Sequence, residues 1–274
     1  MNAEKTLLVI AAPEHDADAY HLSGFLAPDP VIFVRAAGER HLAVSSLEYG
    51  RAKKHAPVDG LHSFEELKFN ELARELKSGA RAFGAAAASL LKKLGAEGSP
   101  VTVPPTLGIG YADEIRARGF ILEPDGRLFA SLRRAKTAEE VSHIEATQRA
   151  VEEAVYHAVE VLREAEVEKS GTLLWRGETL TSEVLRSEID VALLRRGCAA
   201  EGTIAAGGAQ AADPHERGSG PLRAGETIIV DVFPRDQRSR YYADMTRTFV
   251  RGEPPEEARR MYAAVLEAQE AALA

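Results

Sequence analysis

Two aspartates, Asp231 and Asp244, and one histidine, His215, are the residues of this sequence best suited to chemistry. Asp231 follows a run of apolar residues, and Asp244 lies in the next apolar stretch of the chain. Two carboxylates side by side are ligands that hard divalent cations favour, because such ions prefer oxygen donors. The pair therefore predicts part of a metal site.

The elements that must position the aspartates form a predicted β-hairpin. Residues Thr227–Phe233 and Arg240–Val250 are rich in β-branched residues, and the polar stretch Pro234–Ser239 turns the chain between them. Side chains alternate across a strand, so Asp231 and Asp244 share a face if they lie opposite each other. Carboxylates at that spacing repel unless a cation or a proton intervenes. We expect a divalent metal, preferably two ions, to resolve the repulsion.

The same spacing is compatible with two ordinary polar residues at strand ends near a turn, where aspartate is common. The surrounding residues favour the metal site. Tyr242 lies two residues before Asp244, and Thr246, Arg247 and Thr248 follow it. With Asp231, this D-M-T-R-T segment resembles the aspartate pair of the pita-bread metallopeptidases, the family of Xaa-Pro aminopeptidase, prolidase and methionine aminopeptidase.

A second segment carries the same resemblance. Residues 205–215 are mostly small residues and glycines that end in Pro214-His215, and they resemble a family segment of this kind. The resemblance implies that His215 lines the substrate pocket and contacts substrate or handles a proton. The alternative is a solvent-exposed loop histidine. The other histidines fall on no family motif, and we interpret them as surface or packing residues.

The resemblance also implies roles around the aspartates. Asp231 would ligate one divalent ion, Asp244 would bridge two, and Thr246 and Arg247 would support the strand that carries Asp244. Because the ligands are rich in carboxylates, manganese is the expected ion, with cobalt or zinc as alternatives. The implied reaction is metal-assisted hydrolysis of the bond before proline, in a peptide with proline at its second position.

Only part of that metal site is expected in this chain. The resemblance implies five protein ligands, of which a histidine and two glutamates would lie beyond the end of this sequence. Residues Glu256–Leu273, opened by Pro254-Pro255, predict an amphipathic helix, and the sequence stops there without a C-cap signal. We therefore expect a C-terminally truncated chain that is inactive by itself. The alternative is a non-catalytic pita-bread-fold module that binds peptide or protein.

The N-terminal part predicts a separate α/β domain, because short strands are mixed with helices. The expected strands and helices include Thr6–Ala12, Val31–Val34, His41–Ser45, Ser63–Leu76, Ala80–Leu94 and Val101–Val103. Residues Asp18–Phe25 resemble the creatinase-type N-terminal domain of the prolyl-specific relatives. We therefore predict a creatinase-like α/β domain over residues 1–132, followed over residues 133–274 by the first half of an α+β pita-bread domain.

Two helices precede the hairpin in the second predicted domain. A capping box formed by Thr137 and Glu140 opens a long helix that reaches about Glu164, and Thr181 begins a helix that Gly197 ends. Half of a pita-bread domain would leave an apolar face and an open strand edge in water, which invites pairing with another chain. We expect a homodimer.

Composition limits the remaining function classes. A net charge of −8 gives no electrostatic case for binding nucleic acid or an anionic membrane. The single cysteine, Cys198, excludes an intrachain disulfide and fits a reducing compartment. The apolar run near the N-terminus is too short for a signal peptide or a membrane span. We expect a cytoplasmic protein with no nucleic-acid or membrane partner.

Overall fold

The computed structural model describes residues 5–274, which form two compact units divided between Ala135 and Lys136. Unit 1 extends up to Ala135 and unit 2 begins at Lys136. Each unit has its own buried apolar core.

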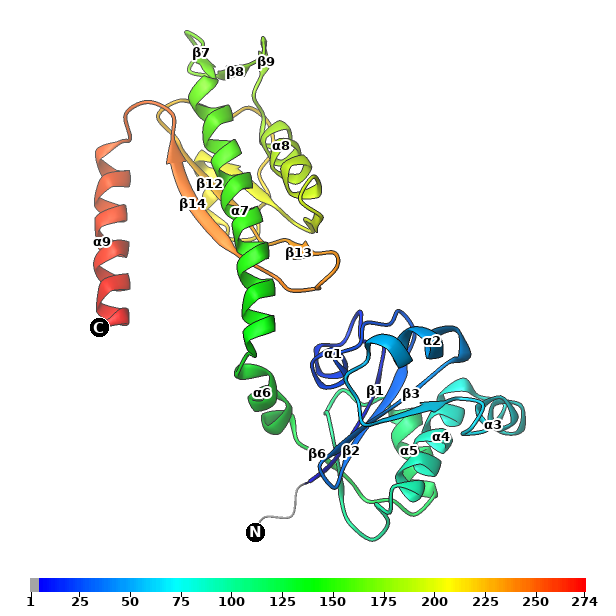
Figure 1. Ribbon diagram of the computed structural model, residues 1–274. Coiled ribbons are helices and arrows are strands. Elements are labelled where there is room, and N and C mark those ends of the chain that lie inside the picture. Colours follow the sequence, from blue (N-terminus) through cyan, green and yellow to red (C-terminus); the bar gives the residue numbers. More distant parts are fainter. Residues whose placement is uncertain (1–4) are drawn as a thin grey trace. The chain divides into compact units, whose positions relative to one another are not determined.

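Unit 1, within its described residues, is built around a six-stranded sheet with the order β4-β3-β2-β1-β5-β6 (Figure 1). The strands are β1 (Thr6–Ala11), β2 (Val31–Ala36), β3 (Glu39–Val44), β4 (Gly60–Ser63), β5 (Val101–Val103) and β6 (Leu122–Pro124). β2 pairs antiparallel with both β1 and β3, whereas β4, β5 and β6 each join a parallel neighbour. The sheet is therefore mixed, and we find the α/β organisation that the sequence predicted.

Helices cover both faces of this sheet because side chains alternate along its strands. The helices are α1 (Ala17–Ser23), α2 (Ser46–His55), α3 (Phe69–Leu76), α4 (Gly79–Lys93), α5 (Ile109–Ala117) and α6 (Gly126–Arg134). Leu8 and Ile10 of β1 pack with α4 and α5, while Val9 packs with α1, α2 and α6 on the other face. Each fully buried apolar side chain contributes roughly 1.5–3 kcal/mol to folding.

The helix predicted over Ser63–Leu76 is wrong in its first half. Residues Gly60–Ser63 form β4, which pairs with β3, and the helix begins only at Phe69. Lys68 takes a left-handed backbone conformation with φ of 57°, which interrupts any helix at that point. Between β4 and this helix, residues 64–68 form a turn in which the Ser63 hydroxyl accepts from the Glu66 N–H at 3.0 Å.

Unit 2 places two long helices on one face of a three-stranded antiparallel sheet. The helices are α7 (Ala138–Glu164) and α8 (Ser182–Leu194), and the strands are β11 (Ile204–Gly207), β12 (Thr227–Val232) and β14 (Met245–Val250), in the order β11-β12-β14. Figure 1 shows α7 lying across β12 and β14. The predicted capping box at the start of α7 is confirmed, with both reciprocal hydrogen bonds between Thr137 and Glu140.

The burial of β12 alternates along the strand. Ile228, Val230 and Val232 are fully buried in the core beneath α7 and α8. Ile229 and Asp231 point to the opposite face and are only partly buried. This alternation puts Asp231 on the face of the sheet that the two helices leave uncovered.

Short elements complete unit 2. They are β7 (Glu166–Val167), β8 (Leu173–Trp175), β9 (Glu178–Thr179), β10 (Cys198–Ala199), the 3-10 helix η1 (Gly208–Ala212), β13 (Arg235–Asp236) and α9 (Glu256–Leu273). β10 and β13 form a two-stranded sheet, and β7, β8 and β9 form another. The predicted helix after Pro254-Pro255 is confirmed as α9, which buries none of its side chains.

Candidate metal centre

The register of the β12–β14 ladder decides which side chains meet across it. Asp231 lies opposite Thr246, and the ladder ends at the pair Val232–Met245. Asp244 is thus not the residue directly opposite Asp231. Asp244 precedes β14 and is two residues from Thr246, so it belongs to the same face as Asp231 but as a diagonal neighbour.

Thr246 fixes the orientation of Asp231. The Thr246 hydroxyl donates a hydrogen bond to the Asp231 carboxylate, with 2.6 Å between Oγ1 and Oδ1. Arg247 donates from Nη1 to the main-chain oxygen of Thr246 at 2.8 Å. Thr246 thus acts on Asp231 across the ladder, whereas the sequence predicted a supporting role toward the strand of Asp244.

The two aspartates influence each other's charge. Partial burial of the carboxyl, although much of the residue is exposed, raises the pKa of Asp244 above its ordinary value. The negative charge of Asp231 and a hydrogen bond between the two carboxyl groups raise this pKa further. The effect of Asp231 and the hydrogen bond require the two carboxyl groups to lie close together.

The donor set fits one side of a divalent-cation site. A cation beside Asp231 and Asp244 would remove their repulsion and would find oxygen donors of the preferred kind. Across residues 5–274, no group of three or more His, Cys, Asp or Glu side chains is arranged to hold a metal ion. The described residues therefore supply two carboxylates and leave most of a six-fold coordination shell to other donors.

His215 lies in the exposed loop between η1 and β12, and the structure does not bring it into a metal-binding group with the aspartates. Its main-chain N–H donates to the Asp213 carboxylate at 3.0 Å. The loop is held further along by Arg186 of α8, which donates to the main-chain oxygens of Arg217 and Gly218 at 2.5 and 2.6 Å. The predicted substrate contact of His215 stays a prediction.

The loop that joins β12 to β14 is docked on α7 by Tyr241, which the sequence motifs did not single out. Its hydroxyl donates to Glu140 Oε1 at 2.7 Å, and its ring stacks on His143 with 5.6 Å between centroids. Its main-chain oxygen accepts from Thr147 Oγ1 at 3.3 Å, and Thr147 is buried. The sequence indicated only that Tyr241 lies three residues before Asp244. Its contacts with Glu140 and Thr147 could not be predicted, because these residues lie 101 and 94 positions away along the chain.

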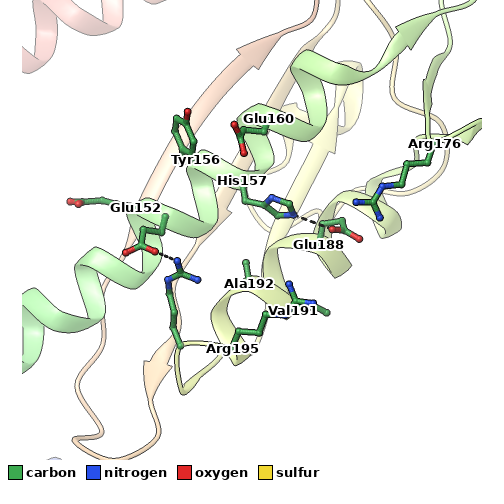
Figure 2. Close-up of a pocket in the computed structure, with 11 residues that line it drawn as sticks. Glu152, Tyr156, His157, Glu160, Arg176, Glu188, Val191, Ala192 and Arg195 are labelled. Carbon is green, nitrogen blue, oxygen red and sulfur yellow. Dashed lines mark hydrogen bonds and ion pairs between the residues drawn. The ribbon is translucent and has the colours of Figure 1, made fainter.

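A groove of about 680 Å³ lies elsewhere in unit 2, between α7 and α8 (Figure 2). It is lined by charged side chains of both signs, and His157 Nε2 lies 3.0 Å from Glu188 Oε2. Neither Asp231 nor Asp244 lines it. The groove is therefore separate from the candidate metal centre.

Comparisons with known proteins identify the unit that carries the aspartates. Residues 142–274 match the model of metallopeptidase family M24. This part of the chain belongs to that family of pita-bread metallopeptidases. The predicted family is thus confirmed, and the M24 segment contains both aspartates, His215, Thr246 and Arg247.

The similarity to individual relatives extends over both units. The chain is 26% identical to the Xaa-Pro dipeptidases of Pyrococcus horikoshii and Pyrococcus furiosus, over 262 and 259 residues. These alignments cover 93% of this chain, which spans 64% of the length of each relative.

Solved structures show the same fold. The prolidase from Pyrococcus furiosus superposes with a TM-score of 0.69 at 21% identity, covering 97% of this chain and 68% of that one. The X-Pro aminopeptidase from Thermotoga maritima gives a TM-score of 0.73 at 18% identity, with coverages of 97% and 68%. The chain therefore has the predicted architecture, an N-terminal α/β domain followed by part of a pita-bread fold.

The helices of residues 5–274 do not meet the requirements for crossing a bilayer. None of them is both long and apolar enough to do so.

Proposed function

We propose that this M24 chain contributes Asp231 and Asp244 to the two-metal centre of a hydrolase that cleaves the bond between an N-terminal residue and proline. The observation that carries the proposal is the pair formed by Asp231, on the uncovered face of the β11-β12-β14 sheet, and Asp244, just outside the β12–β14 ladder on the same side; burial and the charge of Asp231 raise the pKa of Asp244. We further propose that the 274-residue chain alone is inactive, because its described residues supply only two ligands.

The substrate class rests on the relatives. Both Pyrococcus proteins are named Xaa-Pro dipeptidases, and their similarity covers unit 1 as well as the M24 segment. A peptide with proline at its second position is therefore the proposed substrate. The cytoplasmic location and the homodimer remain predictions from the sequence.

Each side chain of the site has a proposed task. Asp231 and Asp244 would hold two divalent ions, for which we propose manganese, with cobalt or zinc as alternatives. Bound ions would lower the pKa of a water molecule and polarise the scissile carbonyl. Thr246 keeps Asp231 in one orientation through its 2.6 Å hydrogen bond, and His215 would hydrogen-bond the substrate near the scissile bond.

Arg247 is proposed to support the site indirectly, without contacting a metal ion. Its guanidinium holds the main chain of Thr246, so it would act on the site only through the strand.

The metal part of the proposal is tested by titrating Mn²⁺ into the purified 274-residue chain. We expect weak binding that disappears in Asp231→Asn and Asp244→Asn, with an unchanged circular dichroism spectrum. Asp213→Asn, in the exposed loop beside His215, is the control and should bind like the wild type. Equal binding by all four proteins would refute the metal site.

The catalytic part needs a second protein. We expect no hydrolysis of an Ala-Pro dipeptide by the chain alone, even with Mn²⁺ present. A chimera that joins residues 1–274 to the part of the Pyrococcus furiosus Xaa-Pro dipeptidase that this chain does not cover should hydrolyse Ala-Pro, and its Asp244→Asn variant should not. Turnover by the chain alone would contradict its proposed inactivity.

A non-catalytic peptide-binding module is the second candidate. It is favoured by the absence of a third metal ligand among residues 5–274. This candidate predicts that the 274-residue chain binds Xaa-Pro peptides and that this binding does not depend on Mn²⁺.

A further inference from the structure

We propose that Tyr241 is a positioning residue of the metal centre, which holds the segment 241–244 against α7 so that the Asp244 carboxylate faces Asp231 before any ion binds. The inference rests on the proposed function for the claim that the two aspartates bind metal. It adds a residue that neither the M24 match nor the resemblance assigns.

Asp244 needs such support because it lies one residue outside the β12–β14 ladder, whose last pair is Val232–Met245. Its place therefore depends on how the preceding loop is anchored, since chain ends of a ladder open more readily than its centre. One anchor is the hydrogen bond from the Ala243 N–H to the main-chain oxygen of Pro234, at 3.3 Å. A β-bridge between Arg235 and Tyr242 is a second anchor, and a further set of contacts is made by Tyr241.

Tyr241 is held by its main chain as well as by its side chain. Its main-chain oxygen accepts from the Asp236 N–H at 3.0 Å, within the loop. It also lies 3.3 Å from Thr147 Oγ1 of α7, whose one proton is shared with the main-chain oxygen of His143 at 3.0 Å. Its ring stacks on His143 at an interplanar angle of 28°. These contacts fix the direction in which the chain leaves Tyr241 toward Asp244.

The hydroxyl of Tyr241 has an acceptor that is itself held in place. Glu140 Oε1 accepts from the Tyr241 hydroxyl at 2.7 Å, while Glu140 Oε2 accepts from the Thr137 N–H at 2.7 Å in the capping box of α7. Both oxygens of one carboxylate are thus used, one by the helix N-terminus and one by the loop. Hydrogen bonds to a carboxylate are stronger than those between neutral groups, so this short bond is a strong link from Tyr241 to α7.

The test compares Tyr241→Phe with Tyr242→Phe in the 274-residue chain. Each substitution removes one phenol oxygen, but Tyr242 is exposed and its contact is with Arg235 of the same loop. We expect the dissociation constant for Mn²⁺ to rise about tenfold in Tyr241→Phe and to stay within about twofold of wild type in Tyr242→Phe.

A double-mutant cycle identifies the hydrogen bond as the cause. Glu140→Ala removes the acceptor and should also weaken Mn²⁺ binding. Tyr241→Phe added to it should cost little more, because both changes remove the same hydrogen bond. Fully additive losses would show that Tyr241 acts on the metal centre by another route, which would overturn the proposal.

Hydrogen exchange of the metal-free protein separates this inference from the proposed function. Amides of residues 241–245 should exchange about tenfold faster in Tyr241→Phe, with no change in Tyr242→Phe. Faster exchange with unchanged Mn²⁺ affinity would make Tyr241 merely structural and would overturn the proposal, as would unchanged exchange. If Asp244→Asn leaves Mn²⁺ binding unaltered, the proposed function fails instead, and exchange alone decides whether Tyr241 holds the segment.

Discussion

Thr246 lies directly opposite Asp231 in the β12–β14 ladder and donates its hydroxyl hydrogen to the carboxylate across a distance of 2.6 Å. A threonine on the neighbouring strand thus orients one of the two proposed metal ligands. The other ligand, Asp244, reaches the same face from just outside the ladder. The site is therefore built by strand register as well as by the identity of its carboxylates.

Thr246→Val should weaken Mn²⁺ binding by about two- to tenfold, because it removes a hydrogen bond worth about 0.5–1.5 kcal/mol while keeping the shape of the side chain. Thr248→Val is the matched control, since Thr248 is exposed on the same strand and lies opposite Ile229. Calorimetric titration of both variants measures the difference. Equal affinities would mean that the hydroxyl does not prepare Asp231 for a cation.

Asp244→Asn and His215→Ala should have different effects in any form of the protein that hydrolyses Xaa-Pro peptides. Asp244→Asn removes a proposed bridging charge, so metal content and kcat should both fall. His215→Ala should keep the metal while kcat/KM falls by ~10²–10³, if the imidazole stabilises charge in the transition state. Metal analysis and steady-state kinetics give the comparison, and equal metal losses would show that the two roles are wrongly assigned.

Gly218→Ala should lower the free energy of unfolding of unit 2 for two reasons, a strained left-handed backbone and a steric clash of the new Cβ atom. Gly218 has φ of 81°, and a Cβ atom there would lie 2.2 Å from the main-chain oxygen of Ala205 in β11. We expect a loss of about 2–4 kcal/mol, measured by urea unfolding with the fluorescence of Trp175, the single tryptophan.

Gly220→Ala is the control for Gly218→Ala. Gly220 has φ of 72° but no atom within 4 Å of a built Cβ. It should therefore lose only about 1–2 kcal/mol from the left-handed conformation. A loss as large as that of Gly218→Ala would show that the contact with Ala205 is unimportant.

The stability of unit 1 should decrease as the pH falls below 6.5. Burial, followed by the charge of Lys93, lowers the pKa of His62 from its ordinary value of 6.5, and His41 acts in the same direction while Glu66 opposes it. His62 therefore binds a proton more readily in the unfolded chain than in the folded unit. The free energy of unfolding is highest above pH 6.5 and decreases as the pH falls from 6.5 toward the lower pKa of His62 in the folded unit.

Urea unfolding followed by circular dichroism at pH 7.5 and pH 5.5 measures this loss. His62→Gln should show a smaller pH dependence, whereas replacing the exposed His55 by Gln should leave it unchanged. The fluorescence of Trp175 reports on unit 2 and should not follow His62. A pH dependence in His62→Gln as steep as that of the wild type would contradict this cause.

Local sequence signals by themselves determined several elements of the fold. The reciprocal pair Thr137–Glu140 predicted the start of α7, and Pro254-Pro255 predicted the start of α9. The β-branched residues of Thr227–Phe233 predicted the strand that is found as β12. These signals work because caps, proline and β-branched side chains act on residues close in sequence. The D-M-T-R-T segment likewise indicated the M24 family from residue types and spacing.

Contacts between distant residues decided what the sequence could not. The connection between β12 and β14 contains β13, which pairs with β10, and a turn in which Ser239 donates to the Asp236 carboxylate. The length and shape of this connection set the register that places Thr246 opposite Asp231. Tyr241 meets Glu140 across 101 positions of the chain. Residue types and local spacing thus determined which side chains could bind a cation, and only the tertiary structure decided which neighbours hold them, because register and packing depend on segments far apart in the sequence.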